Sequence, residues 1–484
     1  MMTRLATRLD GTPPTWRLGA DIDVIGITAD SRLVRPKMIF AALPGMRADG
    51  RDFIAAAVAQ GAAAILAPLG TPWPPGTPPR PLLLDPDPRK RLAEIAAHLA
   101  GPMPRRILAV TGTNGKSSTV DFLRQISQAD GRKAASLGTL GLIASGFSNT
   151  ESLTTPDPVV LANQLARLRA AGIDDVALEA SSHGLAQRRL DGITIAGAAF
   201  TNLTRDHLDY HGDMAAYRAA KLHLFEALLP SGAPVIAMSD LESDTLTSLQ
   251  AITKARQLEL MTVGPNGSAV DIIGATPTPQ GQILHIAIDG IRREIELPLV
   301  GRFQADNALL AAVLSRAIGI DSALDYISGL RPVRGRLQWI NSLPNGAAVY
   351  VDYAHTPDAL ERLLAALRPH TAGRLILVFG AGGDRDAGKR PLMGAVAARL
   401  ADLAVITDDN PRNENPALIR AAIKAACPAC LELADRRRAI AEALSLAQSG
   451  DVVVVAGKGH EQGQIIGRTV IPFDDAAVIT ELVG

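Results

Sequence analysis

The stretch ILAVTGTNGKSSTVDFL, residues 107–123, joins an apolar run, a glycine-rich turn and a segment with helical periodicity. This order is typical of a buried strand, a phosphate-binding loop and a helix whose N-terminus faces phosphate oxygens. Lys116 is expected to neutralise charge on the outer phosphates, and the Ser117 hydroxyl to bind magnesium. The usual pattern has a glycine where this chain has Val110, so the loop is a shortened variant. We therefore predict an ATP site at this turn.

The rest of the chain predicts an α/β protein with three domains. With 484 residues it exceeds what one core usually supports. Short β-rich runs such as VALEA, RLILVFGAG and DVVVVAGKG alternate with alanine- and leucine-rich helical stretches, which favours parallel sheets covered by helices. We expect a small N-terminal α/β domain (1–104), a central ATPase-like domain with a mostly parallel sheet (105–331) and a C-terminal Rossmann-like domain (332–484). The stretch LGTPWPPGTPPRP, residues 69–81, is predicted to be a surface loop.

Composition limits the function classes. Lysine plus arginine number 49, as do aspartate plus glutamate, so charge gives no reason to expect a nucleic acid or an acidic membrane as partner. No run of 18 apolar residues and no apolar signal core are present, and we expect a cytoplasmic protein without membrane insertion. Cys427 and Cys430 have no second pair, so incidental cysteines are favoured over a redox motif or half of a zinc site.

Two further strand ends carry metal-binding side chains. Glu179 ends the apolar run VALE, and the stretch TNLTRDHLDYHGD brings Asp206, His207 and His211 after another strand. Magnesium prefers oxygen ligands and keeps several waters, so one carboxylate, one hydroxyl and ATP oxygens would suffice. His207 and His211 are four residues apart, which leaves a zinc site as an alternative.

Eight motifs in order resemble one family, the Mur ligases, in particular the member that adds the third residue of the peptidoglycan stem peptide. They are TGTNGKS, LEASSHGL, TNLTRDHLDYHGDM, YRAAKLHLF, VDYAHTPDAL, GAGGDRDAGKRPLMG, DDNPR and AGKGHE. The resemblance runs from the DSR motif at residues 30–32 to Glu461. It implies an enzyme that transfers the ATP γ-phosphate to the D-glutamate carboxylate of UDP-N-acetylmuramoyl-L-alanyl-D-glutamate. An incoming amine then attacks the acyl-phosphate.

The resemblance also implies site residues. The catalytic set would be Lys116, Glu179, His207, Lys221 and Arg336. Magnesium would be held by Ser117, Glu179, His207 and Lys221, the last as a carbamate. ATP contacts would be Gly112, Thr113, Asn114, Gly115, Lys116, Ser117, Ser118, Asn307, Arg336 and Asp352. Two positions, Gln304 and Gln338, depart from the family pattern, and in the sequence they lie near Asn307 and Arg336.

For the nucleotide-sugar, which the N-terminal domain would help to bind, the matching positions are Ser31, Met46, Arg47, Ala48, Thr154, Thr155, Ser181, Gln187 and Arg189. Hydroxyls and an arginine suit a diphosphate and carboxylates. On sequence alone, Ser31 and Gln187 could equally be ordinary cap or turn residues.

The third substrate would be bound by the C-terminal domain through Arg385, Asp409, Asn410, Pro411, Arg412, Gly457 and Glu461. Members of the family of this type add either meso-diaminopimelate or L-lysine, which differ by one carboxylate. Arg412 offers a fork that matches that carboxylate, so we predict meso-diaminopimelate. A salt bridge from Arg412 to Glu414 is the alternative use of this arginine.

Other classes stay open at this point. A folylpolyglutamate synthetase shares the loop and the amide-bond chemistry but should lack GKGHE and the N-terminal DSR motif. A nucleotide switch or binding protein would need no amine pocket. A Rossmann oxidoreductase would need a G-x-G-x-x-G turn, which fails at Arg385. We expect the protein to be a monomer.

Overall fold

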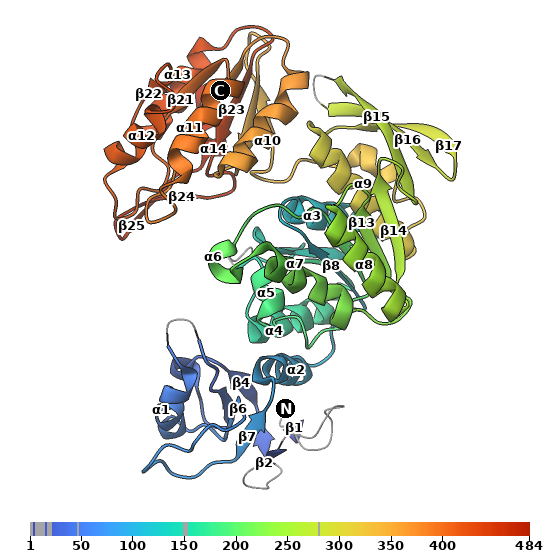
Figure 1. The fold of residues 1–484 in the computed structure, drawn as a ribbon, viewed down its shortest axis with the longest axis vertical. Coiled ribbons are helices and arrows are strands. Elements are labelled where there is room, and N and C mark those ends of the chain that lie inside the picture. The colour runs from blue at the N-terminus through green and yellow to red at the C-terminus, as the bar shows by residue number, and fades with distance from the viewer. Residues whose placement is uncertain (1–2, 5–14, 17–21, 46–47, 149–152, 279–280) are drawn as a thin grey trace. The chain divides into compact units, whose positions relative to one another are not determined.

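The computed structural model describes residues 3–4, 15–16, 22–45, 48–148, 153–278 and 281–484 (Figure 1). The chain divides into two compact units, one of Met1–Ala269 with Leu310–Leu324 and the other of Val270–Leu309 with Asp325–Gly484. Each unit contains parallel strands covered by helices, so the predicted α/β class is confirmed.

The first unit begins with a small sheet in the order β2-β7-β6-β5-β4. Strands β4 (Gly26–Thr28), β5 (Met38–Ala41), β6 (Ala64–Pro68) and β7 (Leu82–Asp85) are parallel, and β2 (Thr15–Trp16) runs antiparallel to β7. Along β6, Ala64 and Leu66 belong to one apolar cluster, while Ile65 and Ala67 belong to another. Because side chains alternate along a strand, both faces of this sheet are buried. A short pair, β1 (Thr3–Arg4) and β3 (Asp23–Val24), lies outside it.

Two helices and a loop complete this part. Helix α1 (Ile54–Ala59) follows the 3-10 helix η2 (Gly50–Phe53), and η1 (Ser31–Leu33) precedes β5. Helix α2 (Pro88–Ala100) begins where the Asp87 side chain accepts a hydrogen bond from Lys90 N (3.2 Å) and ends at Gly101, whose φ is +93°. Residues 69–81 form no helix or strand, as predicted for the proline-rich loop.

The central sheet of the first unit has the order β10-β9-β11-β8-β12-β13-β14. Its strands are β8 (Arg106–Thr111), β9 (Ala134–Gly138), β10 (Gly141–Ile143), β11 (Asp175–Glu179), β12 (Gly197–Phe200), β13 (Pro234–Met238) and β14 (Glu259–Gly264). All neighbours are parallel except β10, which is antiparallel to β9. Since β8 lies between β11 and β12, the loops after these three strands emerge side by side. In open α/β sheets, ligands bind at this edge.

The helices of the central region are listed in chain order: α3 (Lys116–Ala129), α4 (Pro158–Ala170), α5 (Ser182–Ala186), α6 (Leu208–His211), α7 (Met214–His223), the π-helix η3 (Leu224–Leu228), α8 (Ser243–Arg256) and α9 (Arg302–Ala317). Helix α3 starts directly at Lys116, so the glycine-rich loop is the connection between β8 and a helix, as the sequence predicted.

Three strands at the start of the second unit were not predicted. β15 (Val270–Thr278), β16 (Gly281–Ile288) and β17 (Ile291–Leu297) are joined in antiparallel fashion. Only one face of β16 is regularly buried, and β17 is mostly exposed with the sequence IRREIEL. Such half-polar strands lack the continuous apolar run that identifies a parallel strand in a sequence.

The remaining second unit contains a sheet in the order β18-β19-β23-β20-β21-β22. The strands are β18 (Gln338–Ser342), β19 (Ala348–Asp352), β20 (Leu375–Phe379), β21 (Leu403–Ile406), β22 (Leu431–Glu432) and β23 (Val452–Ala456). All pairs are parallel except β18 with β19. A separate hairpin is formed by β24 (Gly463–Ile466) and β25 (Thr469–Pro472). The short helices η4 (Asp325–Gly329) and η5 (Arg368–His370) also lie in this unit.

Helices cover both faces of this sheet (Figure 1). One apolar cluster contains residues of α10 (Pro357–Leu367), α11 (Lys389–Leu400) and α12 (Pro416–Lys424), and the other contains residues of α13 (Arg436–Leu446) and α14 (Asp475–Val483). Arg436 and Asp475 form a fully buried ion pair (2.7 Å) that ties α14 to the start of α13. The Arg436 guanidinium also donates to Ala456 O (3.0 Å), at the end of β23.

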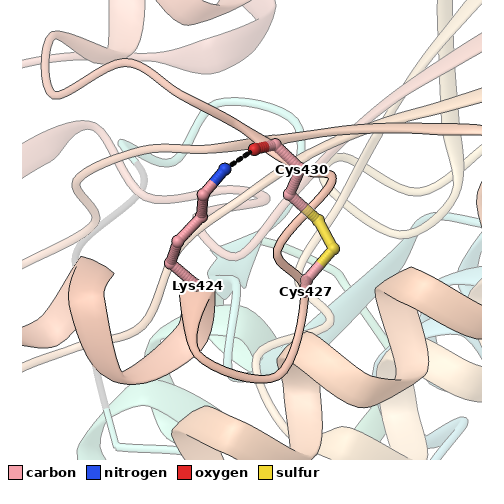
Figure 2. Close-up of a disulfide and its surroundings, with 3 residues drawn as sticks. All are labelled: Lys424, Cys427 and Cys430. Atoms are coloured by element: carbon pink, nitrogen blue, oxygen red, sulfur yellow. Dashed lines mark hydrogen bonds between the residues drawn. A yellow bond between two sulfur atoms is a disulfide. The ribbon is translucent and has the colours of Figure 1, made fainter.

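The two cysteines, which the sequence analysis treats as incidental, are paired in the structure. Cys427 and Cys430 form a disulfide in the turn after α12, with Cα atoms 5.4 Å apart (Figure 2). The turn, closed by Cys430 N donating to Cys427 O (3.0 Å), brings the two residues within disulfide reach. Lys424 donates to the Cys430 carbonyl, and both cysteines belong to the apolar cluster that contains α12.

Candidate active site

The glycine-rich loop is held by the loop that follows β12. Thr113 N donates to Asn202 O (2.8 Å), and Asn114 N donates to the Asn202 side-chain oxygen (2.9 Å). A Cβ at Gly112, whose φ is +141°, would overlap the Thr201 hydroxyl, so the close approach of the two loops requires glycine there. These contacts fix the loop between two neighbouring strands.

The N-terminus of α3 is available to an anion. Gly115 is the N-cap with φ +84°, and in the described structure no side-chain hydrogen bond caps this helix. Ser117 and Ser118 lie buried in its first turn. Because the first N–H groups of a helix have no partner within it, this end is a suitable phosphate site.

Two lysines meet at the same loop carbonyl. Lys116 Nζ donates to Gly112 O (2.9 Å) and Thr113 O (2.8 Å), and Lys221 Nζ donates to Gly112 O as well (2.7 Å). Lys221 is 1% exposed and faces the Tyr217 ring at 4.5 Å. Burial, reinforced by the charge of Lys116, holds the pKa of Lys221 well below its usual range. The structure therefore places a lysine with weakened basicity beside the phosphate loop.

Glu179 is the buried last residue of β11. Its two carboxylate oxygens accept hydrogen bonds from Thr139 N (2.8 Å) and the Thr139 hydroxyl (3.2 Å). A Cβ at Gly138 would overlap this carboxylate. The turn after β9 thus fixes Glu179 in one orientation beside the strand that leads into the phosphate loop.

The residues expected to contact the nucleotide-sugar form one network near Glu179. The Thr155 hydroxyl donates to Glu179 O (2.7 Å) and lies 3.0 Å from the Ser181 hydroxyl. The Arg189 guanidinium donates to Thr155 O and to the Gln187 side-chain oxygen (2.7 Å). Thr154 joins through its hydroxyl, 3.1 Å from that of Thr139. The sequence therefore identified five residues that the fold brings together: Thr154, Thr155, Ser181, Gln187 and Arg189.

The positions in the N-terminal sheet region are less connected. Ser31 begins η1, which is capped by the Asp30 side chain accepting from Arg32 N (2.9 Å). Ala48 accepts a hydrogen bond from Gly45 N (3.1 Å). Met46 and Arg47 lie outside the described residues.

His207 belongs to an aromatic cluster. It adopts a left-handed backbone conformation (φ +53°) immediately before the short helix α6. Its ring lies 4.8 Å from that of His183, which also contacts the rings of Tyr210 (4.1 Å) and His211 (5.4 Å). Burial and the neighbouring histidines lower the pKa of His183 to about 4. His183 is a residue that the sequence reasoning passed over, although the quoted motif LEASSHGL contains it.

His207 and His211, the pair behind the zinc alternative, both have rings in contact with that of His183. Among the described residues, no group of three or more histidine, cysteine, aspartate or glutamate side chains is placed to hold a metal. Ser117 and Glu179 offer oxygen donors, the ligand type that magnesium prefers and completes with water and phosphate.

In the second unit, the predicted ATP residues surround the start of β18 and the end of β19. Gln304 donates to Arg336 O (3.1 Å), and its side-chain oxygen faces the Asn307 amide (3.5 Å). The Asp352 carboxylate accepts from Leu337 N (2.6 Å) and Ala354 N (2.7 Å). Gln304, a departure from the family pattern, therefore links Asn307 to the backbone of Arg336.

Arg336 itself lies over an aromatic ring. Its guanidinium carbon is 4.7 Å from the centre of the Tyr353 ring, and the His460 ring is 5.0 Å from that of Tyr353. The Arg336 Nε is buried without a hydrogen-bond partner among the described residues. Gln338, the other departure, accepts from Gly335 N (2.8 Å) and so closes the turn that carries Arg336.

The DNPR loop follows β21 and is held from both sides. Asp409 and Asn410 are buried. Gly383 N donates to Asn410 O (2.9 Å), and Arg412 Nη1 donates to Gly383 O (2.8 Å). The loop after β20 therefore holds the predicted amino-acid site together.

The backbone of Arg412 is held by the β24–β25 hairpin. Arg412 has φ +51°, its N–H donates to Ile465 O (3.0 Å), and its carbonyl accepts from Gly467 N (2.7 Å). The alternative salt bridge to Glu414 is not formed among the described residues, because Glu414 pairs with the buried Arg390 (2.8 Å).

The remaining predicted residues lie in the loops after β20, β21 and β23. Gly457, whose φ is +116°, follows β23, and a Cβ there would lie 2.9 Å from the Asp409 carboxylate. Glu461 accepts a hydrogen bond from the Asn410 amide (2.8 Å). Pro411 lies in the same loop, and Arg385 is exposed after β20. Asp409, Asn410, Gly457 and Glu461 thus form one cluster, beside which Arg412 is fixed.

The comparisons with known proteins agree with this arrangement. Family models match three successive parts of the chain: "Mur ligase family, catalytic domain" at residues 23–98, "Mur ligase middle domain" at 110–315 and "Mur ligase, glutamate ligase domain" at 335–459. The chain belongs to the Mur ligase family. The resemblance inferred from the motifs is confirmed.

Relatives define the branch of the family. The chain is 52% identical over 462 residues to UDP-N-acetylmuramoyl-L-alanyl-D-glutamate–2,6-diaminopimelate ligase of Caulobacter vibrioides, covering 94% of both chains. A solved structure of a ligase with the same name matches with a TM-score of 0.72 and 32% identity, covering 100% of this chain and 99% of that one. The folylpolyglutamate synthase of Mycobacterium tuberculosis matches at 0.64 with 20% identity, covering 82% and 95%, which shows a shared fold alone.

Proposed function

We propose that this protein is an ATP-dependent ligase that joins meso-diaminopimelate to the D-glutamate γ-carboxylate of UDP-N-acetylmuramoyl-L-alanyl-D-glutamate, a step of peptidoglycan synthesis. The observation that carries the choice of amino acid is the DNPR cluster. A guanidinium, two carboxylates and an amide from Asp409, Asn410, Arg412 and Glu461 gather at one sheet edge, and they complement a zwitterionic side-chain end.

The chemistry follows from the poor reactivity of a carboxylate. Phosphorylation by ATP gives the D-glutamate carboxylate a leaving group, and the amine of diaminopimelate then displaces phosphate to form the amide. Lys116 would stabilise charge on the phosphoryl group, and the N–H groups at the start of α3 would hold the other phosphates. From the second unit, Arg336, Asn307 and Asp352 would contact ATP. The Nε of Arg336 is buried and has no hydrogen-bond partner among the described residues, so this donor is not used by another protein group.

Magnesium fits the donors around the phosphate loop. Ser117 and Glu179 offer oxygens, and His207 would contribute to a second site. When bound, magnesium would neutralise charge on the phosphate oxygens. Lys221 would join this set as a carbamate, which supplies oxygen ligands that the lysine amine lacks.

Carbamylation of Lys221 needs the neutral amine. Its burial and the nearby Lys116 favour that form. The product would carry a negative charge, which Lys116 and magnesium would both attract. This supports the proposal that Lys221 is modified in the active enzyme.

The nucleotide-sugar would be bound by the network of Thr154, Thr155, Ser181, Gln187 and Arg189, with Ser31 and residues 46–48 contributing from the N-terminal sheet. The proposal also includes three domains, at residues 1–104, 105–331 and 332–484, a monomeric state and a cytoplasmic location. Among the described residues, no helix is both long and apolar enough to span a membrane.

The test is a substrate comparison. Protein, ATP, magnesium and the UDP-muramoyl-dipeptide are incubated with meso-diaminopimelate or L-lysine, phosphate release is measured, and the product mass is determined. We expect release and a tripeptide product with diaminopimelate. Preference for lysine would contradict the choice of amino acid, and release with folate-type substrates alone would contradict the ligase assignment.

A further inference from the structure

A buried lysine lies behind the amino-acid cluster. Lys458 follows Gly457 after β23 and is 0% exposed. Its Nζ lies 2.8 Å from the Asn410 side-chain oxygen, 2.7 Å from Gly463 O and 3.5 Å from Glu461 Oε2. An ammonium group has three N–H donors, and these three acceptors account for all of them. Lys458 therefore has no donor left for a substrate.

The same contacts fix the orientation of Asn410. Its side-chain oxygen accepts from Lys458 and from Ile465 N (3.0 Å), and both partners can only donate. The oxygen is saturated, so the amide nitrogen must face the other way, where it donates to Glu461 Oε2 (2.8 Å). One N–H of Asn410 is left over.

Glu461 is oriented by the same group. Its Oε2 faces both Asn410 and Lys458, while among the described residues the structure contains no hydrogen bond to Oε1. The Glu461 side chain is 31% exposed, so a ligand can reach this carboxylate. The pair thus presents one donor and one acceptor, the complement of a carboxylate beside an ammonium.

Lys458 also balances charge. Its Nζ is 3.8 Å from the Asp409 carboxylate and 3.5 Å from that of Glu461, and the buried Arg436 adds a second positive charge that acts on both. Removing Lys458 would take away a cation that lies near both carboxylates and would weaken what holds their orientation.

We propose that Lys458 is a positioning residue for the amino-acid substrate, which it never touches: it orients Asn410 and Glu461 so that their remaining N–H and oxygen meet the zwitterionic end of diaminopimelate. The inference rests on the proposed function. It adds Lys458 to the residues that determine specificity, although Lys458 lies behind the residues that contact the substrate.

The test compares the KM values for the three substrates between the wild type and a variant of Lys458. Lys458→Met should raise KM for diaminopimelate by about tenfold to a hundredfold, the usual effect of misplacing binding groups by about an ångström. KM for ATP and for the UDP-muramoyl-dipeptide should stay within about threefold, since Lys458 contacts neither the phosphate loop nor Arg336. Lys424→Met, which removes a lysine donating to a backbone carbonyl in the same unit, is the matched control and should leave all three values near those of the wild type.

A double variant tests whether Lys458 acts through Asn410. If Lys458 acts through Asn410, Lys458→Met should add less than about threefold to the KM already raised by Asn410→Ala, so the two effects should not be additive. Lys458→Gln, which keeps a donor, should fall between the wild type and Lys458→Met.

Three results would overturn the inference. They are an unchanged KM for diaminopimelate, an equal rise in all three KM values in folded protein, and failure of both Lys458→Met and Lys458→Gln to fold, which would make the residue structural. A wild-type enzyme that does not use diaminopimelate would instead refute the proposed function.

Discussion

Replacing Arg412 by alanine should remove the preference for diaminopimelate. The only hydrogen bond of the Arg412 guanidinium within the described structure is Nη1 to Gly383 O, so the rest of the fork is available to a carboxylate. The backbone conformation (φ +51°) is equally unfavourable for arginine and alanine, so the variant changes the side chain without adding backbone strain.

The expected loss of kcat/KM follows from the two hydrogen bonds that the Arg412 guanidinium can donate to one carboxylate. Each hydrogen bond to a charged group contributes about 1.5–3 kcal/mol. Arg412 is half-buried, so we take the lower half of that range, which gives about 3–4 kcal/mol for the pair. At about 1.4 kcal/mol for each tenfold, kcat/KM for diaminopimelate should fall between about a hundredfold and several hundredfold. For L-lysine, which lacks the second carboxylate, kcat/KM should change little.

The assay measures initial rates of phosphate release for both amino acids with wild type, Arg412→Ala and Arg412→Lys. The lysine variant retains the charge without the fork and should lie between the other two. Thermal unfolding establishes that each variant is folded. Equal use of L-lysine by the wild type, or the same discrimination in Arg412→Ala, would refute the reasoning.

Lys116→Ala should lower kcat by at least about a hundredfold, because a charge-stabilising group is lost; a near-normal rate in folded protein would contradict this role. Lys221→Ala should be nearly inactive and partly recovered by added short carboxylates, and the intact mass of active native protein should include one carbon dioxide; an unmodified active enzyme would exclude the carbamate. Asp475→Ala should lower the free energy of unfolding in urea by about 3–5 kcal/mol, since it leaves Arg436 buried and unpaired. Glu481→Ala, which removes the exposed ion pair of Glu481 with Arg437 (2.6 Å), should lower the free energy of unfolding far less, and equal losses would argue against the buried pair.

The parallel strands were predictable because a strand that is buried on both faces has a continuous apolar run in the sequence. β20 (LILVF) and β23 (VVVVA) are buried throughout. β17 (IRREIEL) was not predictable in this way, because its charged residues are exposed and leave no such run. The cysteine disulfide depends on how the chain turns after α12, which spacing alone does not determine.

The positions of the proposed site residues at strand ends were predictable where a motif marks them, as at Lys116 and Asn410. Their partners were not. Thr139 can hold Glu179 because β9, which Thr139 follows, is the neighbour of β11 in the sheet. Asn202 can hold the phosphate loop because β12, which Asn202 follows, is the neighbour of β8. Lys458 lies between glycines in the sequence, where nothing indicates that its ammonium is fully buried and shared by two side chains. Contacts of this kind arise from topology, and no local pattern encodes them.

The hairpin that holds the backbone of Arg412 has a consequence for protein engineering. Residues 465 and 467 fix the left-handed turn at Arg412, although they lie more than fifty positions later in the chain. Grafting the tetrapeptide DNPR into a ligase of different preference would therefore transplant the arginine without the support that aims it. A successful graft would have to carry two segments, the tetrapeptide and the matching hairpin, and changes in the hairpin alone could alter which amino acid is accepted.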